Sequence, residues 1–153
     1  MKKKILSLLI VIDLIAGAAM GQTQRTAGVN GCATDCFFTD CSVTCPPNTL
    51  PKCHCVLGAF GSCGCQLINT GTKSVDAGSL PTLKNQSVFP GIIAQLNKAG
   101  YASYANSLSA LFSSLSLKDA DAYKTNYANI QTMIDADPVT AAKVQDIIAG
   151  NFR

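Results

Sequence analysis

Apolar residues recur at three- and four-residue spacing from residue 89 to the end of the printed sequence. This spacing places them on one face of an amphipathic helix. The first stripe ends at Gly100, a residue that can take the left-handed conformation that closes a helix. The longest stripe follows it. Its members are Tyr101, Tyr104, Leu108, Leu111, Phe112 and Leu115.

Two further stripes carry start signals. Ser116 followed by Asp119 imitates a capping box, and Asp137 followed by Pro138 supplies an N-cap and a proline at the first helical position. Gly150 then gives the last stripe a stop signal. Short connections favour helices that pack as antiparallel neighbours. The pattern therefore predicts a small four-helix bundle over residues 88–153.

The segment 32–65 has a different composition, because it contains all eight cysteines and several glycines and prolines. A segment this short cannot bury enough apolar surface to offset its chain entropy, so it needs cross-links. In an exported chain, an even number of cysteines indicates disulfides. We therefore expect all of them to be bonded. They are Cys32, Cys36, Cys41, Cys45, Cys53, Cys55, Cys63 and Cys65.

The spacing of the last four cysteines suggests a partial pairing. Cys53 and Cys55 share one face of an extended segment, as do Cys63 and Cys65. Residues 56–62 include two glycines and can turn the chain back, which allows a β-hairpin. We therefore expect two disulfides between these two pairs, with the four earlier cysteines bonded among themselves in an irregular segment.

Two alternatives use the same cysteines. Thiolates of Cys53, Cys55, Cys63 and Cys65 could bind zinc or copper(I), and their two C-x-C steps resemble those of metallothioneins. The resemblance is limited to those steps. Alternatively, Cys63 and Cys65 could form a redox-active pair. The disulfide hypothesis implies no cofactor, whereas the metal-binding alternative implies zinc or copper.

The first residues have the three-part pattern of a secretory signal peptide. Three lysines follow Met1, residues 5–12 are almost entirely apolar, and the small residues Ala19 and Gly21 fit a cleavage site. We expect cleavage after Gly21 and no stable membrane span afterwards, because Asp13 interrupts the apolar stretch. The remaining segments are then a flexible leader over 22–31 and a connector of low order over 66–87.

Charge and residue inventory exclude some functions. The predicted signal removes three lysines and one aspartate, so nine basic and eight acidic residues remain. The basic residues are scattered rather than clustered, which argues against nucleic-acid binding. The chain has no glutamate and a single histidine, His54, which lies between two cysteines. Acid-base catalysis usually needs more than this, so we expect His54 to be an ordinary loop residue and the protein not to be an enzyme.

Together these observations predict a mostly α-helical protein. Its C-terminal four-helix bundle would be preceded by an irregular, disulfide-rich module, residues 32–65. The expected location is secreted or periplasmic. The expected role is non-enzymatic binding or structure with an unknown extracytoplasmic partner. Metal binding and thiol-disulfide chemistry are the alternatives.

Overall fold

The computed structural model describes residues 30–68, 74–75 and 80–152. The predicted signal peptide and residues 22–29 of the predicted leader lie outside the described residues. Within the described residues, the strands are β1 (Gly31–Asp35), β2 (Thr39–Thr44), β3 (Thr49–Val56), β4 (Phe60–Leu67), β5 (Ser74–Val75) and β6 (Thr82–Leu83). The helices are η1 (Gln86–Val88), α1 (Phe89–Lys98), α2 (Ala102–Ser116), α3 (Ala120–Ala136) and α4 (Pro138–Gly150).

Residues 31–67 form two antiparallel hairpins, so the predicted mostly α fold with an irregular module is wrong. The strands lie in two sheets, with the orders β1-β2-β6 and β3-β4-β5. The second hairpin was expected, but the first was not. Along β2 the buried residues are Thr39, Cys41 and Val43, and the residues between them are exposed. This alternation is what a strand with one buried face produces. The fold combines a strand module with four helices.

The predicted connector contributes one short strand to each sheet. In its described part, β5 pairs with β4 and β6 pairs with β2. The backbone N–H of Lys84, just after β6, donates to the carbonyl of Phe38 at 2.9 Å. Segment 80–85 is therefore attached to the first hairpin. The division into a module, a connector and a helical domain stays a prediction.

The helices begin and end near the residues that the sequence indicated. Asp119 and Asp137 each accept a hydrogen bond from a backbone N–H in the first turn of α3 and α4. Gly100 has a φ of 87° immediately after Ala99, the C-cap residue of α1, as a left-handed helix end requires. Ser116 differs from expectation, because it is the last residue of α2 rather than a cap of α3. No helix among the described residues is long and apolar enough to cross a membrane.

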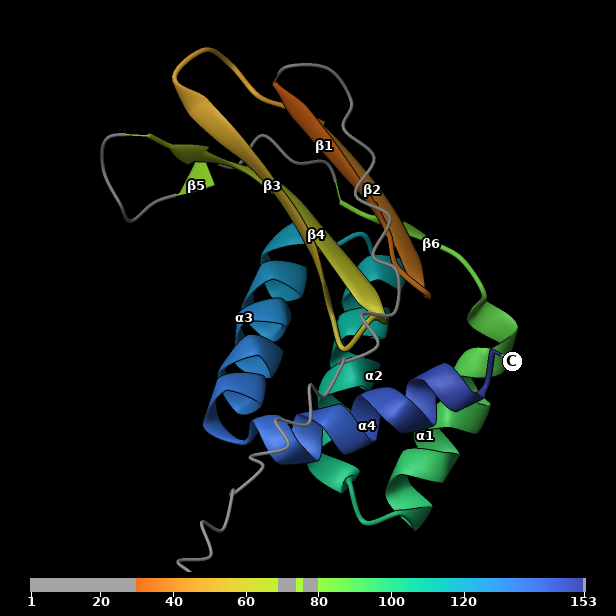
Figure 1. The fold of residues 1–153 in the computed structure, drawn as a ribbon. Coiled ribbons are helices and arrows are strands. Elements are labelled where there is room, and N and C mark those ends of the chain that lie inside the picture. Colours follow the sequence, from red (N-terminus) through yellow and green to blue (C-terminus); the bar gives the residue numbers. More distant parts are fainter. Residues whose placement is uncertain (1–29, 69–73, 76–79, 153) are drawn as a thin grey trace, which may run out of the picture.

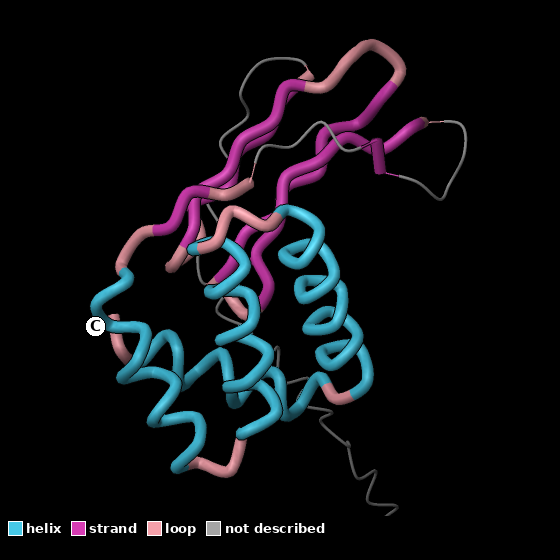
Figure 2. The backbone as a smooth tube through the Cα atoms, turned by 180° about the vertical axis from the view of Figure 1, so that it is seen from behind, coloured by secondary structure: helices cyan, strands magenta, loops and turns pink. Residues whose placement is uncertain are grey.

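One hydrophobic core joins the strand module to the helices. Phe38, in the turn between β1 and β2, and Phe60, the first residue of β4, are fully buried in the same cluster as Phe89 of α1. The ring of Phe38 lies 5.1 Å from that of Phe89, measured between centroids. Figure 2 shows the helices gathered at one end of the strands. The other end of the strand module extends away from them.

Candidate binding surface on the strand module

Four disulfides join the two hairpins to each other. Two run from the first strand and its following turn to β3, and two run from β2 and the residue after it to β4. The pairs are Cys32–Cys53, Cys36–Cys55, Cys41–Cys63 and Cys45–Cys65, with Cα atoms 5.6 to 5.9 Å apart. All eight cysteines are bonded. Each disulfide therefore ties one sheet to the other.

The expected pairing within each half of the module is wrong. Cys53 and Cys55 are bonded to Cys32 and Cys36, not to Cys63 and Cys65. The physical reason is that the first half is also a hairpin. Residues four apart in a strand share a face just as residues two apart do. Both hairpins consequently present a row of cysteines, and the two rows meet between the sheets.

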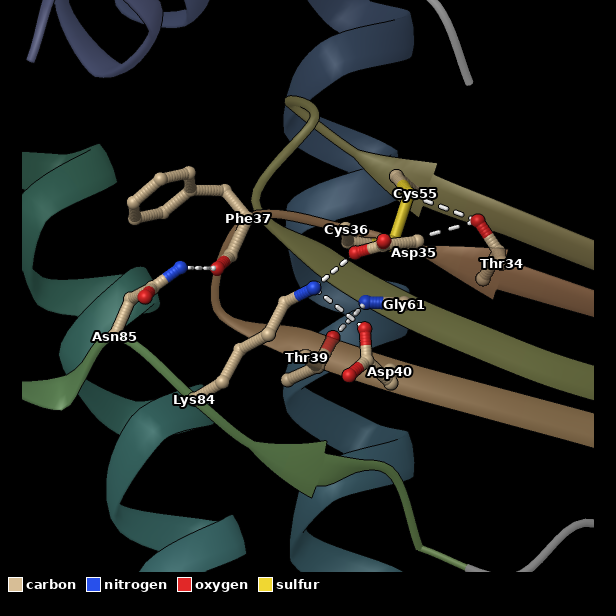
Figure 3. Close-up of polar contacts among 10 residues, drawn as sticks. All are labelled: Thr34, Asp35, Cys36, Phe37, Thr39, Asp40, Cys55, Gly61, Lys84 and Asn85. Atoms are coloured by element: carbon tan, nitrogen blue, oxygen red, sulfur yellow. Dashed lines mark hydrogen bonds and ion pairs between the residues drawn. A yellow bond between two sulfur atoms is a disulfide. The ribbon is translucent and has the colours of Figure 1, made fainter. Parts of the chain in front are cut away.

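Gly61 lets the sheets approach closely at the end nearest the helices. A Cβ at this position would lie 2.8 Å from the Sγ of Cys36 and 3.3 Å from the hydroxyl of Thr39. The Gly61 N–H donates to the Thr39 hydroxyl at 2.6 Å, and its carbonyl accepts from the hydroxyl of Tyr123 in α3 at 2.7 Å. One glycine thus links both sheets and a helix (Figure 3 shows the contact with Thr39).

A charged cluster lies on the outer face of the first sheet. Asp35 and Asp40 are directly opposite each other in the β1-β2 register. Like charges in this position repel. Lys84 donates to both carboxylates, and its bond to Asp40 is 2.5 Å long (Figure 3). Sequence reasoning missed this cluster, although the position of Asp40 between the buried Thr39 and Cys41 indicates an outward carboxylate.

His54 contacts a helix rather than a catalytic partner. It is exposed on β3, and its ring meets the edge of the Tyr127 ring at a centroid distance of 5.4 Å. The Tyr127 hydroxyl donates to the His54 carbonyl at 3.2 Å. Partial desolvation lowers the pKa of His54, and the charge of Lys52 lowers it further. Burial raises the pKa of Tyr127. Near neutral pH both rings are therefore uncharged and act as packing groups.

The four cysteines of the metal hypothesis do not form a separate group. Cys53, Cys55, Cys63 and Cys65 each belong to a different disulfide with the opposite sheet. A different set is close together, because the sulfurs of Cys32, Cys53 and Cys63 all lie within 4.8 Å of one another. Sulfur in a disulfide is not a thiolate ligand. A metal would require these bonds to be reduced first.

The end of the strand module away from the helices exposes apolar side chains. This distal end consists of the loop 46–48, which leads into β3 (Figure 1), together with Leu50 of β3 and Ile68, the residue after β4. Leu50 is 51% exposed and Ile68 is 55% exposed. The loop is braced from within, since the Thr49 hydroxyl donates to the Pro46 carbonyl at 2.7 Å. The N–H of Ile68 donates to the carbonyl of Asn48 at 3.3 Å.

The distal end combines a restricted backbone with exposed apolar side chains. Prolines and disulfides restrict its backbone, so little conformational entropy would be lost when a partner binds. Apart from the neutral amide of Asn48, its exposed side chains are apolar, and none is a carboxylate or a nucleophile. Comparison with protein-family models, curated proteins and solved structures finds no match to this chain.

Proposed function

We propose that this protein is exported and acts outside the cytoplasm as a non-enzymatic binding or structural protein. The observation that carries the proposal is that all four disulfides cross between the two hairpins. Such bonds persist in oxidising compartments and are rare in the cytosol. The secretory pattern of residues 1–21 supports the same location.

The strand module is the part we assign to recognition. Its helix-facing end is buried in the shared core, whereas its distal end is held away from the helices and exposes Leu50 and Ile68. Fully burying an exposed aliphatic side chain of this size contributes about 1.5 to 3 kcal/mol, and because Leu50 and Ile68 are about half exposed, binding would gain roughly half of that from each. Two such residues on a rigid frame can anchor a partner surface without any catalytic group.

Mass spectrometry of the protein recovered outside the cell tests the location. We expect a mass that corresponds to a chain beginning at Gln22 or within two residues of it, lowered by the eight hydrogens lost in four disulfides. Alkylation should modify no cysteine before reduction and all eight after it. Recovery of the chain with Met1 retained in the membrane fraction would contradict export.

The same mass and alkylation measurements distinguish a metal-bound module from a disulfide-bonded one. If zinc or copper occupied the module, several thiols would react with an alkylating reagent after a chelator is added, without any reductant. The native mass spectrum would then also show the metal in a fixed ratio to protein. Neither result is expected of a fully disulfide-bonded module.

Site-directed crosslinking tests the surface. When the protein carries a photoreactive amino acid at position 50, we expect it to crosslink to a partner present in its native extracellular environment. The matched control is position 117, because Leu117 is 79% exposed but lies at the end of α2. Aspartate at position 68 should strongly reduce the crosslink yield from position 50. Equal yields from positions 50 and 117 would exclude the distal end as the recognition surface.

A further inference from the structure

Three sulfur atoms from two different disulfides lie close together between the sheets. The Sγ atoms of Cys32, Cys53 and Cys63 are within 4.8 Å of one another, although only Cys32 and Cys53 are bonded. Cys63 is bonded instead to Cys41. The remaining cysteines form no other such group of three in the part of the chain that the structure describes. We call Cys32, Cys53 and Cys63 the sulfur triad.

We propose that the sulfur triad is a site of intramolecular thiol-disulfide exchange. A thiolate on Cys63 attacks the Sγ of Cys53, a Cys53–Cys63 bond forms, the Cys32–Cys53 bond breaks, and Cys32 leaves as the thiolate. One disulfide and one thiolate are present before and after the step, so no electron is gained or lost. Such exchange needs the attacking sulfur to reach a sulfur of the existing bond.

The strand register favours Cys53 as the sulfur that is attacked. Cys53 and Cys63 are directly opposite each other on β3 and β4. Opposite residues in antiparallel strands have Cα atoms about 4.5 to 5.5 Å apart, within the range that a disulfide spans. Cys53 is 3% exposed, whereas Cys32 is only partly buried. The more accessible Cys32 is the better leaving thiolate, because water can solvate it.

The exchange begins when an external dithiol reduces the Cys41–Cys63 bond. One thiolate of the dithiol attacks the Sγ of Cys63, a residue that is only partly buried, and releases Cys41 as a thiol. The second thiol then displaces Cys63 as a thiolate, and the dithiol leaves as a cyclic disulfide. The dithiol thus supplies both electrons. After the exchange, thiols remain on Cys32 and Cys41, and only Cys36–Cys55 and Cys45–Cys65 still tie the two sheets together.

Limited reduction of the natural chain tests this directly. The protein is treated with less than one equivalent of dithiothreitol, quenched with acid, labelled with N-ethylmaleimide and digested for peptide mapping. We expect the species with two labels to carry them on Cys32 and Cys41 and to contain a Cys53–Cys63 bond. Two labels on the partners of any one original disulfide, or a scattered distribution, would overturn the proposal.

Two single variants provide a matched comparison without an external reductant. Cys41→Ser leaves a thiol on Cys63 inside the sulfur triad, and most of the label should then appear on Cys32. Cys45→Ser leaves a thiol on Cys65, which lies two residues further along β4 and outside the triad, so the label should stay on Cys65. The proposal is contradicted if the label remains on Cys63 in Cys41→Ser. It is also contradicted if the label is spread over several cysteines to the same extent in both variants. If the Cys41→Ser variant loses the circular dichroism spectrum of the folded protein, the limited reduction of the natural chain is the deciding test of the exchange.

Discussion

The interior of the strand module is built largely from sulfur, whereas the interior beside the helices is built from aliphatic and aromatic side chains. The module's own buried cluster consists of Val43, Cys45, Cys53 and Cys65, with Cys32 and Cys63 packed against it. The helical cluster instead holds residues such as Leu96, Leu108 and Ile130. Covalent bonds restrict the unfolded chain, while burial of apolar area stabilises the folded one. The two regions should therefore respond to different perturbations.

The largest expected effect is that of full reduction. Each disulfide closes a loop of about 20 residues, and bonds of this kind typically contribute about 3 kcal/mol. We expect reduction to remove the strand module from the folded state while much of the helical signal remains. Thermal unfolding followed by circular dichroism, with and without reductant, checks this. Identical melting temperatures would show that the sulfurs are dispensable.

Phe38→Ala tests the contact between the two regions. The Phe38 ring is fully buried, and its centroid lies 5.4 Å from that of Phe60 and 5.1 Å from that of Phe89. Removing it should lower the free energy of unfolding by about 3 to 5 kcal/mol. Leu117→Ala is the control, because an exposed side chain should change stability by about 0.5 kcal/mol or less. Urea unfolding of the oxidised proteins measures both. Similar values would mean that the regions do not share a core.

The isolated segment 87–153 completes that comparison. It contains all four helical stripes but lacks the module residues that cover Phe89 and Tyr123. We expect it to be helical but to melt at a lower temperature than the intact chain. A fragment as stable as the whole protein would support the division into separate domains.

Gly61→Ala should have an intermediate effect. The added Cβ would meet the Sγ of Cys36 at 2.8 Å, so the sheets would have to separate or the disulfide would have to move. Overpacking of this kind costs about 1 to 3 kcal/mol. Gly64→Ala lies on the same strand, but a Cβ there would have no described atom within 4 Å. Chemical unfolding of both variants checks whether only Gly61→Ala is destabilised.

Lys84→Met should have the smallest effect. The Asp35 and Asp40 side chains are 66% and 54% exposed, so we expect a loss of about 0.2 to 1 kcal/mol. Partial burial lowers the pKa of Lys84, but its hydrogen bonds to Asp35 and Asp40 raise it more, above its usual 10.5. This stability is therefore fully present below pH 10.5 and is lost as the pH rises through the raised folded-state value. The unfolding free energies of the natural chain and Lys84→Met should differ below pH 10.5 and become similar only once the pH has risen above the raised folded-state pKa of Lys84.

The helices could be predicted because their signals are local. Asp137 and Pro138 mark the start of α4 within a few residues of sequence, and Gly100 marks the end of α1 in the same way. These signals depend on backbone hydrogen bonds within one turn. Tertiary contacts were not needed to interpret them.

The disulfide pairing could not be predicted, because it depends on how two hairpins stack. The C-x-C step of Cys53 and Cys55 indicates a shared face, but not whether that face meets β4 or another sheet. The first hairpin had a weaker signal in the sequence, the alternation of Cys41 and Val43 with polar residues along β2. The distal end could not be identified either, since the exposure of Leu50 and Ile68 follows from where the helices stop.

The order of the four disulfides along the chain has a consequence for proteolysis. Every disulfide joins a cysteine at or before position 45 to one at or after position 53. A single cut anywhere between those positions, for example after the exposed Lys52, is therefore bridged four times. The two pieces stay covalently joined until a reductant is present. A protease that nicks this protein leaves its mass, apart from one added water, and much of its surface intact.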